Sequence, residues 1–212
     1  MESSRASIFA AGPPGHDRRL ALTFDDGPAA STADVLDALS AAAVRATFFV
    51  IGRFVAGREP TLRRARADGH ELGVHGFEHL NPLLVRDAAV LSGELSRCAD
   101  ELERAVGERP RLVRPPYGGD AGRTAREAGK LGLGPVVLWT VLGFDWEEDE
   151  QAASIVARVL GEAQPGAIVC LHDGDRKDPG VHRHATVEAL PAIVRGLHSD
   201  GYELVTVSEL LR

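Results

Sequence analysis

The sequence has few cysteines, no long apolar run and no block of like charge. Cys98 and Cys170 are its only cysteines, which excludes a disulfide framework and a Cys-x-x-Cys metal motif. The longest stretch without a charged residue, 131–144, is interrupted by glycine and proline and falls short of the ~20 apolar residues of a membrane helix. Basic residues are dispersed and the formal net charge is −7, so we predict neither a membrane span nor a nucleic-acid partner.

The N-terminus also lacks the features of a secretion signal. Glu2 and the short apolar run at 8–11 provide neither the basic segment nor the long apolar core of such a signal. We therefore expect a cytoplasmic chain as written, unless a leader has been removed. The chain of 212 residues suits one globular domain, predicted over residues 18–212 and preceded by an N-terminal extension over residues 1–17.

Short apolar runs alternate with amphipathic segments along the chain. The apolar runs predict strands at 20–24, 46–51, 72–75, 112–114, 136–140, 167–171 and 204–207. The segments between them predict helices at about 31–43, 60–68, 87–106, 120–129, 150–161 and 187–197, the first of them opened by a variant capping box from Ser31 to Asp34. Right-handed crossovers between such strands favour a parallel sheet, either open or closed into a barrel.

The placement of the polar residues favours the barrel. In a β/α barrel the carboxyl ends of all strands meet at one rim, whereas an open sheet gathers only the strands beside its switch point. Six polar residues fall at or just after the ends of different predicted strands: Asp25, Asp26, His75, Arg114, Asp145 and His172. We therefore predict a β/α barrel with its chemistry at that rim.

Two histidines and a carboxylate have the spacing of a metal site. His75 and His79 are four residues apart, a spacing with which two imidazoles reach one metal ion, and Asp26 offers an oxygen donor from another strand end. Two histidines and one carboxylate leave coordination positions open for water and substrate. The simpler interpretations are a solvated turn at Asp25-Asp26 and two surface histidines; the His-Glu-x-x-His motif of zincins is absent.

The other strand ends carry groups that are weak signals individually. Arg114 precedes a stiff Pro-Pro segment, Asp145-Trp146 opens an acidic run, and His172 follows the sixth predicted strand. A rigid loop, a solvated helix start over residues 147–150 and a buried histidine are the ordinary explanations. Their occurrence in order at successive strand ends indicates one shared site.

With these motifs the chain resembles the polysaccharide deacetylase family, also called the NodB-homology domain or carbohydrate esterase family 4, from about Arg18 to Leu211. The matching motifs are Thr23-Phe24-Asp25-Asp26-Gly27-Pro28, His75-Gly76-Phe77-Glu78-His79, Arg114-Pro115-Pro116-Tyr117, Asp145-Trp146 and Leu171-His172-Asp173. The resemblance implies a distorted (β/α)7 barrel as a single catalytic domain. It also implies one divalent metal ion, usually zinc with cobalt, manganese and nickel as alternatives, and hydrolysis of sugar acetyl groups.

The resemblance also implies a role for each matched residue. Asp26, His75 and His79 would bind the metal, with Asp25 as general base and His172 as general acid. Arg114 would orient Asp25 and be held by Asp145, and the Tyr117 amide would stabilise the oxyanion. Trp146, Cys170 and Pro116 would line the pocket for the acetyl group.

Three positions depart from the family pattern. Gly76 replaces a usual serine or threonine, Leu142 stands where an aspartate is common, and Cys170 replaces a leucine. The metal set is intact in spite of these changes. The segment 173–185 is predicted to overhang the site and to contribute to substrate selection, whereas its ordinary interpretation is a mobile surface loop.

The predicted function is metal-dependent removal of N-acetyl groups from a glucosamine-containing oligo- or polysaccharide, chitin-like or peptidoglycan. A water activated by the metal would attack the acetyl carbonyl, with a base and an acid on either side. Within the same class, an O-acetyl esterase of the xylan type and an amidohydrolase of non-sugar substrates remain open. A catalytically inert carbohydrate-binding barrel and a structural domain with incidental histidines are the alternatives from other classes.

Overall fold

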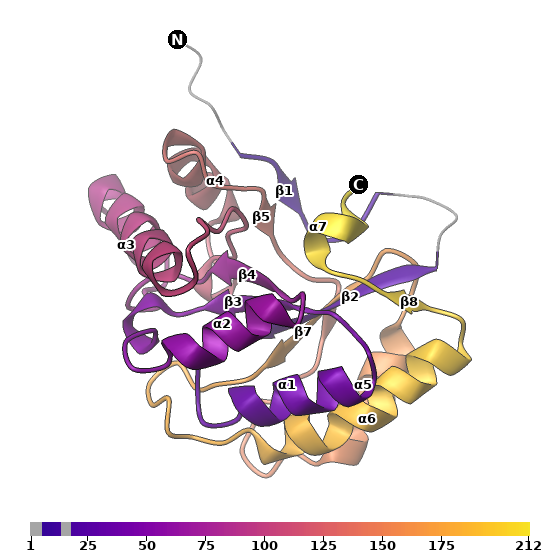
Figure 1. The fold of residues 1–212 in the computed structure, drawn as a ribbon. Helices are drawn as coiled ribbons and strands as arrows, with labels where there is room; N and C mark the ends of the chain where they lie inside the picture. Colours follow the sequence, from indigo (N-terminus) through magenta and orange to yellow (C-terminus); the bar gives the residue numbers. More distant parts are fainter. Residues whose placement is uncertain (1–5, 14–17) are drawn as a thin grey trace.

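The computed structural model describes residues 6–13 and 18–212. Its strands are β1 (Ile8–Phe9), β2 (Arg19–Asp25), β3 (Thr47–Val50), β4 (Glu71–Val74), β5 (Val136–Val137), β6 (Val141–Leu142), β7 (Ile168–His172) and β8 (Glu203–Leu204). Its helices are α1 (Thr32–Ala41), η1 (Gly52–Phe54), α2 (Glu59–Ala67), α3 (Ala88–Val106), η2 (Pro116–Gly118), α4 (Ala121–Lys130), α5 (Ala152–Glu162), α6 (His184–Ser199) and α7 (Val207–Leu210). Figure 1 shows the longer helices arranged around the outside of the strands.

The parallel strands close into a distorted (β/α)7 barrel, as predicted. They pair in the order β4-β3-β2-β7-β6, with β8 beside β2 and β1 beside β5. Val113 bridges Val74 of β4 on one side and Val136 of β5 on the other. Since β5 and β6 are consecutive pieces of one segment, these bridges close the ring. An open sheet is therefore excluded, and the predicted strand at 112–114 is reduced to these bridges.

The alternation of side chains along β2 and its neighbours separates two apolar layers. Leu22 and Phe24 point outward and pack with the surrounding helices, whereas Ala21 points into the barrel with Phe49 and Ile168. Each fully buried side chain of the size of phenylalanine contributes about 2 kcal/mol of hydrophobic stabilisation. These apolar side chains fill the lower part of the barrel interior, and polar side chains occupy the inward positions at the carboxyl ends of the strands.

Helix α3 shows how local signals fix the frame around this rim. Asp87 caps it by accepting a hydrogen bond from the Ala89 amide at 2.8 Å, and Gly107 ends it with a φ of 78°. Its apolar face includes Leu95 and Cys98, and the Cys98 thiol donates to the Val50 carbonyl at 3.2 Å. The predictions of this helix and of Cys98 as a core residue are confirmed.

The predicted strand at 136–140 is wrong in its second half. The Arg114 guanidinium donates from Nε to the Val137 carbonyl at 3.2 Å and from Nη2 to the Leu138 carbonyl at 3.0 Å. Because a side chain from outside the strand uses these acceptors, the sheet ladder stops there and resumes at Val141.

The predicted strand at 204–207 also ends earlier, because a helix cap competes for its last residues. β8 stops at Leu204, and Val207 begins α7. Thr206 Oγ1 accepts from the Glu209 amide at 3.4 Å, while the Glu209 carboxylate accepts from the Thr206 amide at 3.0 Å. This reciprocal capping box determines the local conformation.

The predicted capping box at the start of α1 is wrong. Ser31 makes no side-chain cap bond; its hydroxyl donates to the Asp173 carbonyl at 2.8 Å. The Thr32 hydroxyl donates to the Asp173 carboxylate at 2.5 Å and accepts from the Ala29 amide at 2.8 Å. Both hydroxyls therefore tie the start of α1 to the loop after β7.

Part of the predicted N-terminal extension joins the barrel, since Ile8 of β1 pairs with Val136 and Ala11 forms a bridge with Ala167. The boundary at residue 18 stays a prediction. Over the residues described, no helix has the length and apolar character needed to cross a bilayer.

Candidate active site

One cavity of about 410 Å³ brings together most of the residues predicted for the site. Its lining includes eight of them, namely Asp25, Asp26, His75, His79, Tyr117, Trp146, Cys170 and His172, whereas Arg114, Asp145 and Pro116 lie outside the lining. Asp25 ends β2, His75 follows β4 and His172 ends β7, so the cavity lies at the carboxyl ends of these strands. The predicted gathering of chemistry at one rim is therefore present in the structure.

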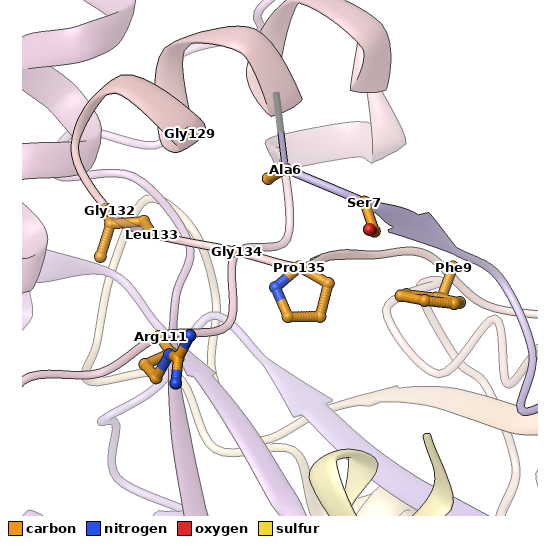
Figure 2. A pocket seen from close by; sticks show the side chains of 9 residues that line it. All are labelled: Ala6, Ser7, Phe9, Arg111, Gly129, Gly132, Leu133, Gly134 and Pro135. Atoms are coloured by element: carbon orange, nitrogen blue, oxygen red, sulfur yellow. The ribbon is translucent and has the colours of Figure 1, made fainter. Parts of the chain in front are cut away.

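A second cavity of about 390 Å³ lies at the other end of the strands, between β1 and the segment that enters β5. Figure 2 shows Ser7 and Phe9 on one side of it and Pro135 on the other. Arg111 is the single ionisable side chain in its described lining. The described lining contains no carboxylate, imidazole or thiol, and so offers none of the usual groups for metal binding.

Asp26, His75 and His79 form the first group of metal-ligating side chains. All three are buried, and Asp26 Oδ1 lies 3.5 Å from His75 Nε2 and 3.2 Å from His79 Nε2. Their ligand atoms lie within 4.8 Å of one another. This separation leaves room for one ion in contact with all three.

The protonation of this group fits a cation. His75 Nδ1 lies 2.8 Å from the Arg114 carbonyl, which only accepts, so Nδ1 carries the proton and Nε2 presents a lone pair to Asp26. Burial lowers the pKa of His75 to about 4, so its ring is neutral. Burial alone would raise the pKa of Asp26, but interactions with His79, His75 and His172 lower it to about 2.

Asp26 Oδ1 is buried and has no hydrogen-bond partner among the described residues. A buried carboxylate oxygen that faces an imidazole lone pair is unfavourable unless a positive ion lies between them. The residues present therefore fit a divalent metal ion.

The loop that carries the histidines is held from behind by Glu94. The Glu94 carboxylate accepts hydrogen bonds from the Phe77 amide at 3.1 Å and the Glu78 amide at 2.8 Å. Gly76 has a φ of 79°, a conformation that other residues adopt only with strain. Asp26 and His79 themselves have positive φ values, 74° and 59°, so two of the three grouped side chains are carried on strained backbone. Glu94 thus holds this loop although Gly76 carries no hydroxyl.

Asp25 is held by a buried arginine, as predicted. Arg114 is fully buried, and its Nη1 donates to Asp25 Oδ1 at 2.8 Å and to the Thr23 hydroxyl at 2.7 Å. Its guanidinium also lies over the Phe49 ring, 4.1 Å from the centroid. One oxygen of Asp25 is thereby fixed, and Oδ2 is left towards the cavity, 3.5 Å from Cys170 Sγ.

Asp145 does not hold Arg114, and this part of the prediction is wrong. The Asp145 carboxylate instead lies 2.8 Å from His172 Nδ1 and accepts from the His172 amide at 2.7 Å and the Thr186 hydroxyl at 2.7 Å. The bonds of Arg114 are already directed to Asp25, Thr23 and two backbone carbonyls. Burial opposes the charged imidazole, but the Asp145 carboxylate outweighs it and raises the pKa of His172 to about 9.

The remaining predicted pocket residues divide into those that line the cavity and one that does not. Trp146 packs edge-on to His172 with ring centroids 5.0 Å apart, and Tyr117 packs edge-on to His79 at 4.8 Å. Pro116 is buried outside the cavity lining, because its ring packs next to Gly76. Its predicted contact with substrate is therefore not supported by its position.

Several residues of the site escaped sequence reasoning. Trp139 lines the cavity, and Glu94 and Thr186 support its histidines, whereas Arg183, which also lines the cavity, belongs to the segment 173–185 predicted to overhang the site. Thr23 alone had a readable signal, because it lies two residues before Asp25 on the same face of a strand. From the predicted rim segment, Arg176 lines the cavity, and its Nε donates to the Tyr117 hydroxyl at 2.9 Å.

The fold and the site together define a β/α barrel in which two imidazoles and a carboxylate that could hold a metal ion lie beside Asp25 and His172 at one rim, an arrangement suited to metal-assisted hydrolysis. Residues 12–136 match the family model described as polysaccharide deacetylase. The chain belongs to this family, which confirms the resemblance seen in its motifs.

Proteins similar to this chain carry deacetylase names. It is 40% identical over 210 residues to a peptidoglycan-N-acetylglucosamine deacetylase of Bacillus cereus, with 94% of this chain and 91% of that protein covered. It is 35% identical over 196 residues to the peptidoglycan-N-acetylglucosamine deacetylase PgdA of Listeria monocytogenes, covering 92% of this chain but 39% of that protein. The chain thus spans about two fifths of the length of this longer relative.

A solved structure has the same fold. The crystal structure of the Bc1960 peptidoglycan N-acetylglucosamine deacetylase, in complex with a substituted N-oxidanyl-benzamide, superposes with a TM-score of 0.88 at 29% identity, covering 97% of this chain and 93% of the other. The structural similarity therefore extends over nearly the whole chain.

Proposed function

We propose that this chain is a metal-dependent deacetylase that hydrolyses N-acetyl groups of a glucosamine-containing oligo- or polysaccharide. The observation that carries the proposal is the pairing of Asp25 with His172 in the register of β2 and β7, beside Asp26, His75 and His79 in one cavity. A carbohydrate-binding module has no use for a base and an acid beside a metal set. The names of the similar proteins support an acetylated sugar of the peptidoglycan type as the substrate.

The donor set favours zinc. Two imidazoles and one carboxylate form a common set for catalytic zinc, with cobalt, manganese and nickel as alternative ions. When bound by Asp26, His75 and His79, the ion would polarise the acetyl carbonyl and lower the pKa of a nearby water.

Asp25 is the general base in this proposal. Arg114 fixes Oδ1, so Oδ2 is the oxygen available to take a proton from the attacking water. Both residues are buried, and the ion pair therefore keeps Asp25 in a single orientation. The Tyr117 amide is proposed to donate to the carbonyl oxygen as negative charge develops on it.

His172 is the general acid. With its pKa raised to about 9, it keeps its proton at neutral pH, and because Asp145 takes Nδ1, Nε2 is the atom that delivers the proton. The carbonyl carbon gains the water oxygen, the carbon–nitrogen bond breaks, and the nitrogen leaves as a free amine after receiving the proton from His172. Acetate and a glucosamine unit are the products. Trp146 walls the pocket for the acetyl methyl group.

The test is acetate release by zinc-reconstituted protein from four substrates: N-acetylglucosamine oligomers, peptidoglycan, acetylated xylan and an aryl acetate. We expect acetate and free amine in equal amounts from at least one of the first two. Acetate release from xylan alone would identify an O-acetyl esterase instead. No acetate from any of the four substrates would favour the alternative of a catalytically inert carbohydrate-binding barrel. The variant Asp25→Asn, which keeps the metal ligands, should lose ~10² to 10⁴-fold in turnover.

A further inference from the structure

A second group of metal-ligating side chains lies in the same cavity, beside the first. It comprises Asp25, Cys170 and His172, whose ligand atoms all lie within 4.8 Å of one another. None of the three belongs to the group formed by Asp26, His75 and His79. Asp25 Oδ2 of this group lies 3.7 Å from His75 Nε2 of the first group.

The register of two strands explains why these three side chains converge. β2 and β7 are parallel neighbours in which Asp25 pairs with His172 and Thr23 with Cys170. Cys170 and His172 are two residues apart, so both side chains point into the barrel, towards the face that Asp25 occupies on β2. Cys170 Sγ lies 3.5 Å from Asp25 Oδ2, and Asp145 holds His172 Nδ1, which leaves Nε2 as the free ring nitrogen.

We propose that Asp25, Cys170 and His172 form a second metal site, which binds a soft divalent ion such as Zn²⁺ when the metal is in excess and thereby inhibits the enzyme. A thiolate, an imidazole and a carboxylate are the donors that zinc, cadmium and cobalt(II) accept together. On binding, the Sγ–H and Nε2–H bonds break, both protons leave to solvent, and bonds from Sγ and Nε2 to the ion form.

The second site fills after the first. His75 already presents a lone pair on Nε2, because its Nδ1 carries the proton. At the second site the thiol hydrogen lies between Cys170 and Asp25 and has to be displaced before the ion enters. The first equivalent of metal therefore goes to Asp26, His75 and His79, and only further metal reaches the second group.

The inhibition rests on the proposed function, whereas the metal binding does not. An ion at the second site would occupy both the proposed base and the proposed acid and fill the space between them. The rate of deacetylation should consequently rise with the first equivalent of zinc and fall as more zinc is added. Binding can be followed separately, without any substrate.

The experiment titrates metal-free protein with Co²⁺ and records the absorption of a thiolate–cobalt charge-transfer band together with the bound metal by equilibrium dialysis. The wild type should bind two equivalents, and the band should appear only with the second. The variant Cys170→Ser should bind one equivalent without the band, and Cys170→Ala should repeat this result without a hydroxyl at the position. Cys98→Ser is the matched control, because Cys98 is buried in the core and donates to the Val50 carbonyl; it should behave as the wild type.

The falling limb of the zinc–activity curve gives the second readout. Loss of one ligand should weaken the second site at least by the ~10 to 100-fold that loss of an outer-shell partner costs. In Cys170→Ser, inhibition should therefore require at least ~10-fold more zinc, whatever the basal rate of the variant. A single equivalent without the band in the wild type would overturn the site, as would a band or a second equivalent that survives both changes at Cys170. Binding as proposed with no deacetylation would instead refute the proposed function alone.

Discussion

Replacing Asp145 by asparagine should move the alkaline limb of the pH–rate profile. Asp145 raises the pKa of His172 from 6.5 to about 9 against the opposing effect of burial. Without the carboxylate, the largest of the interactions that raise the pKa of His172 is lost, so this pKa falls below its wild-type value of about 9. A general acid must be protonated, so activity of the wild type is lost as pH rises through about 9, and activity of the variant is lost at a lower pH.

The size of the effect follows from the same shift. The rise of the His172 pKa from 6.5 to about 9 corresponds to ~3 kcal/mol of preference for the imidazolium. At about pH 8 the wild type would be ~90% protonated at His172, and a return of the pKa to the ordinary 6.5 would leave ~3%, so the loss in kcat/KM is up to ~30-fold. The other charged groups that act on His172 are Asp25 and Asp26, and both are unchanged in the variant.

The assay is kcat/KM for an N-acetylglucosamine oligomer between about pH 5 and about pH 10, on zinc-loaded protein. Thr186→Val is the matched control: it removes a hydrogen bond to Asp145 but keeps the charge, so its alkaline limb should stay near 9. An alkaline limb that remains near 9 in folded, metal-loaded Asp145→Asn would refute the assignment of His172 as the acid raised by Asp145.

Three further substitutions test the supports of the site. Arg114→Lys keeps the positive charge but loses the planar guanidinium, which donates hydrogen bonds to Asp25, Thr23 and two backbone carbonyls. We expect this variant to lose ~2 to 5 kcal/mol of unfolding free energy, measured in urea, and to have a lower kcat. Glu94→Ala leaves two loop amides without their acceptor and should weaken zinc binding ~10 to 100-fold in competition with a chelator. Burial raises the pKa of Asp173 from 3.8 to about 7, so the folded state favours the neutral carboxyl. The contribution of this neutral carboxyl to the free energy of unfolding is present below about pH 4 and is lost as pH rises through about 7. Asp173→Asn should therefore be up to ~4 kcal/mol more stable than the wild type at about pH 8, and equally stable at about pH 4.

The sequence predicted those parts of the fold that depend on local patterns. Helix α3 carries its own cap at Asp87, its stop at Gly107 and an apolar stripe, and its bounds were predicted closely. The end of the last strand was missed although Thr206 and Glu209 form a readable capping box, because the apolar run was given more weight. At this position two local signals competed, and the capping box prevailed over the apolar run.

The parts that failed depend on contacts between distant residues. The strand at 136–140 breaks because Arg114 takes two of its carbonyls, which no pattern within that segment reveals. For the same reason, the sequence placed Asp145 in the site but not its partner, since only the folded barrel brings it to His172 rather than Arg114. Glu94 lies within a predicted helix, and nothing in its spacing indicates the loop amides that it binds.

The most direct test of the account is the dependence of deacetylation on the first equivalent of zinc. Metal-free protein is titrated with Zn²⁺, and acetate release from the best N-acetylated oligosaccharide is measured at each addition, in the wild type and in Asp26→Asn. We predict no turnover without metal, a linear rise that ends at one equivalent in the wild type, and no comparable rise in the variant, because Asp26 Oδ1 is the buried oxygen that faces both imidazoles. Full turnover by protein shown to be free of metal would contradict the account.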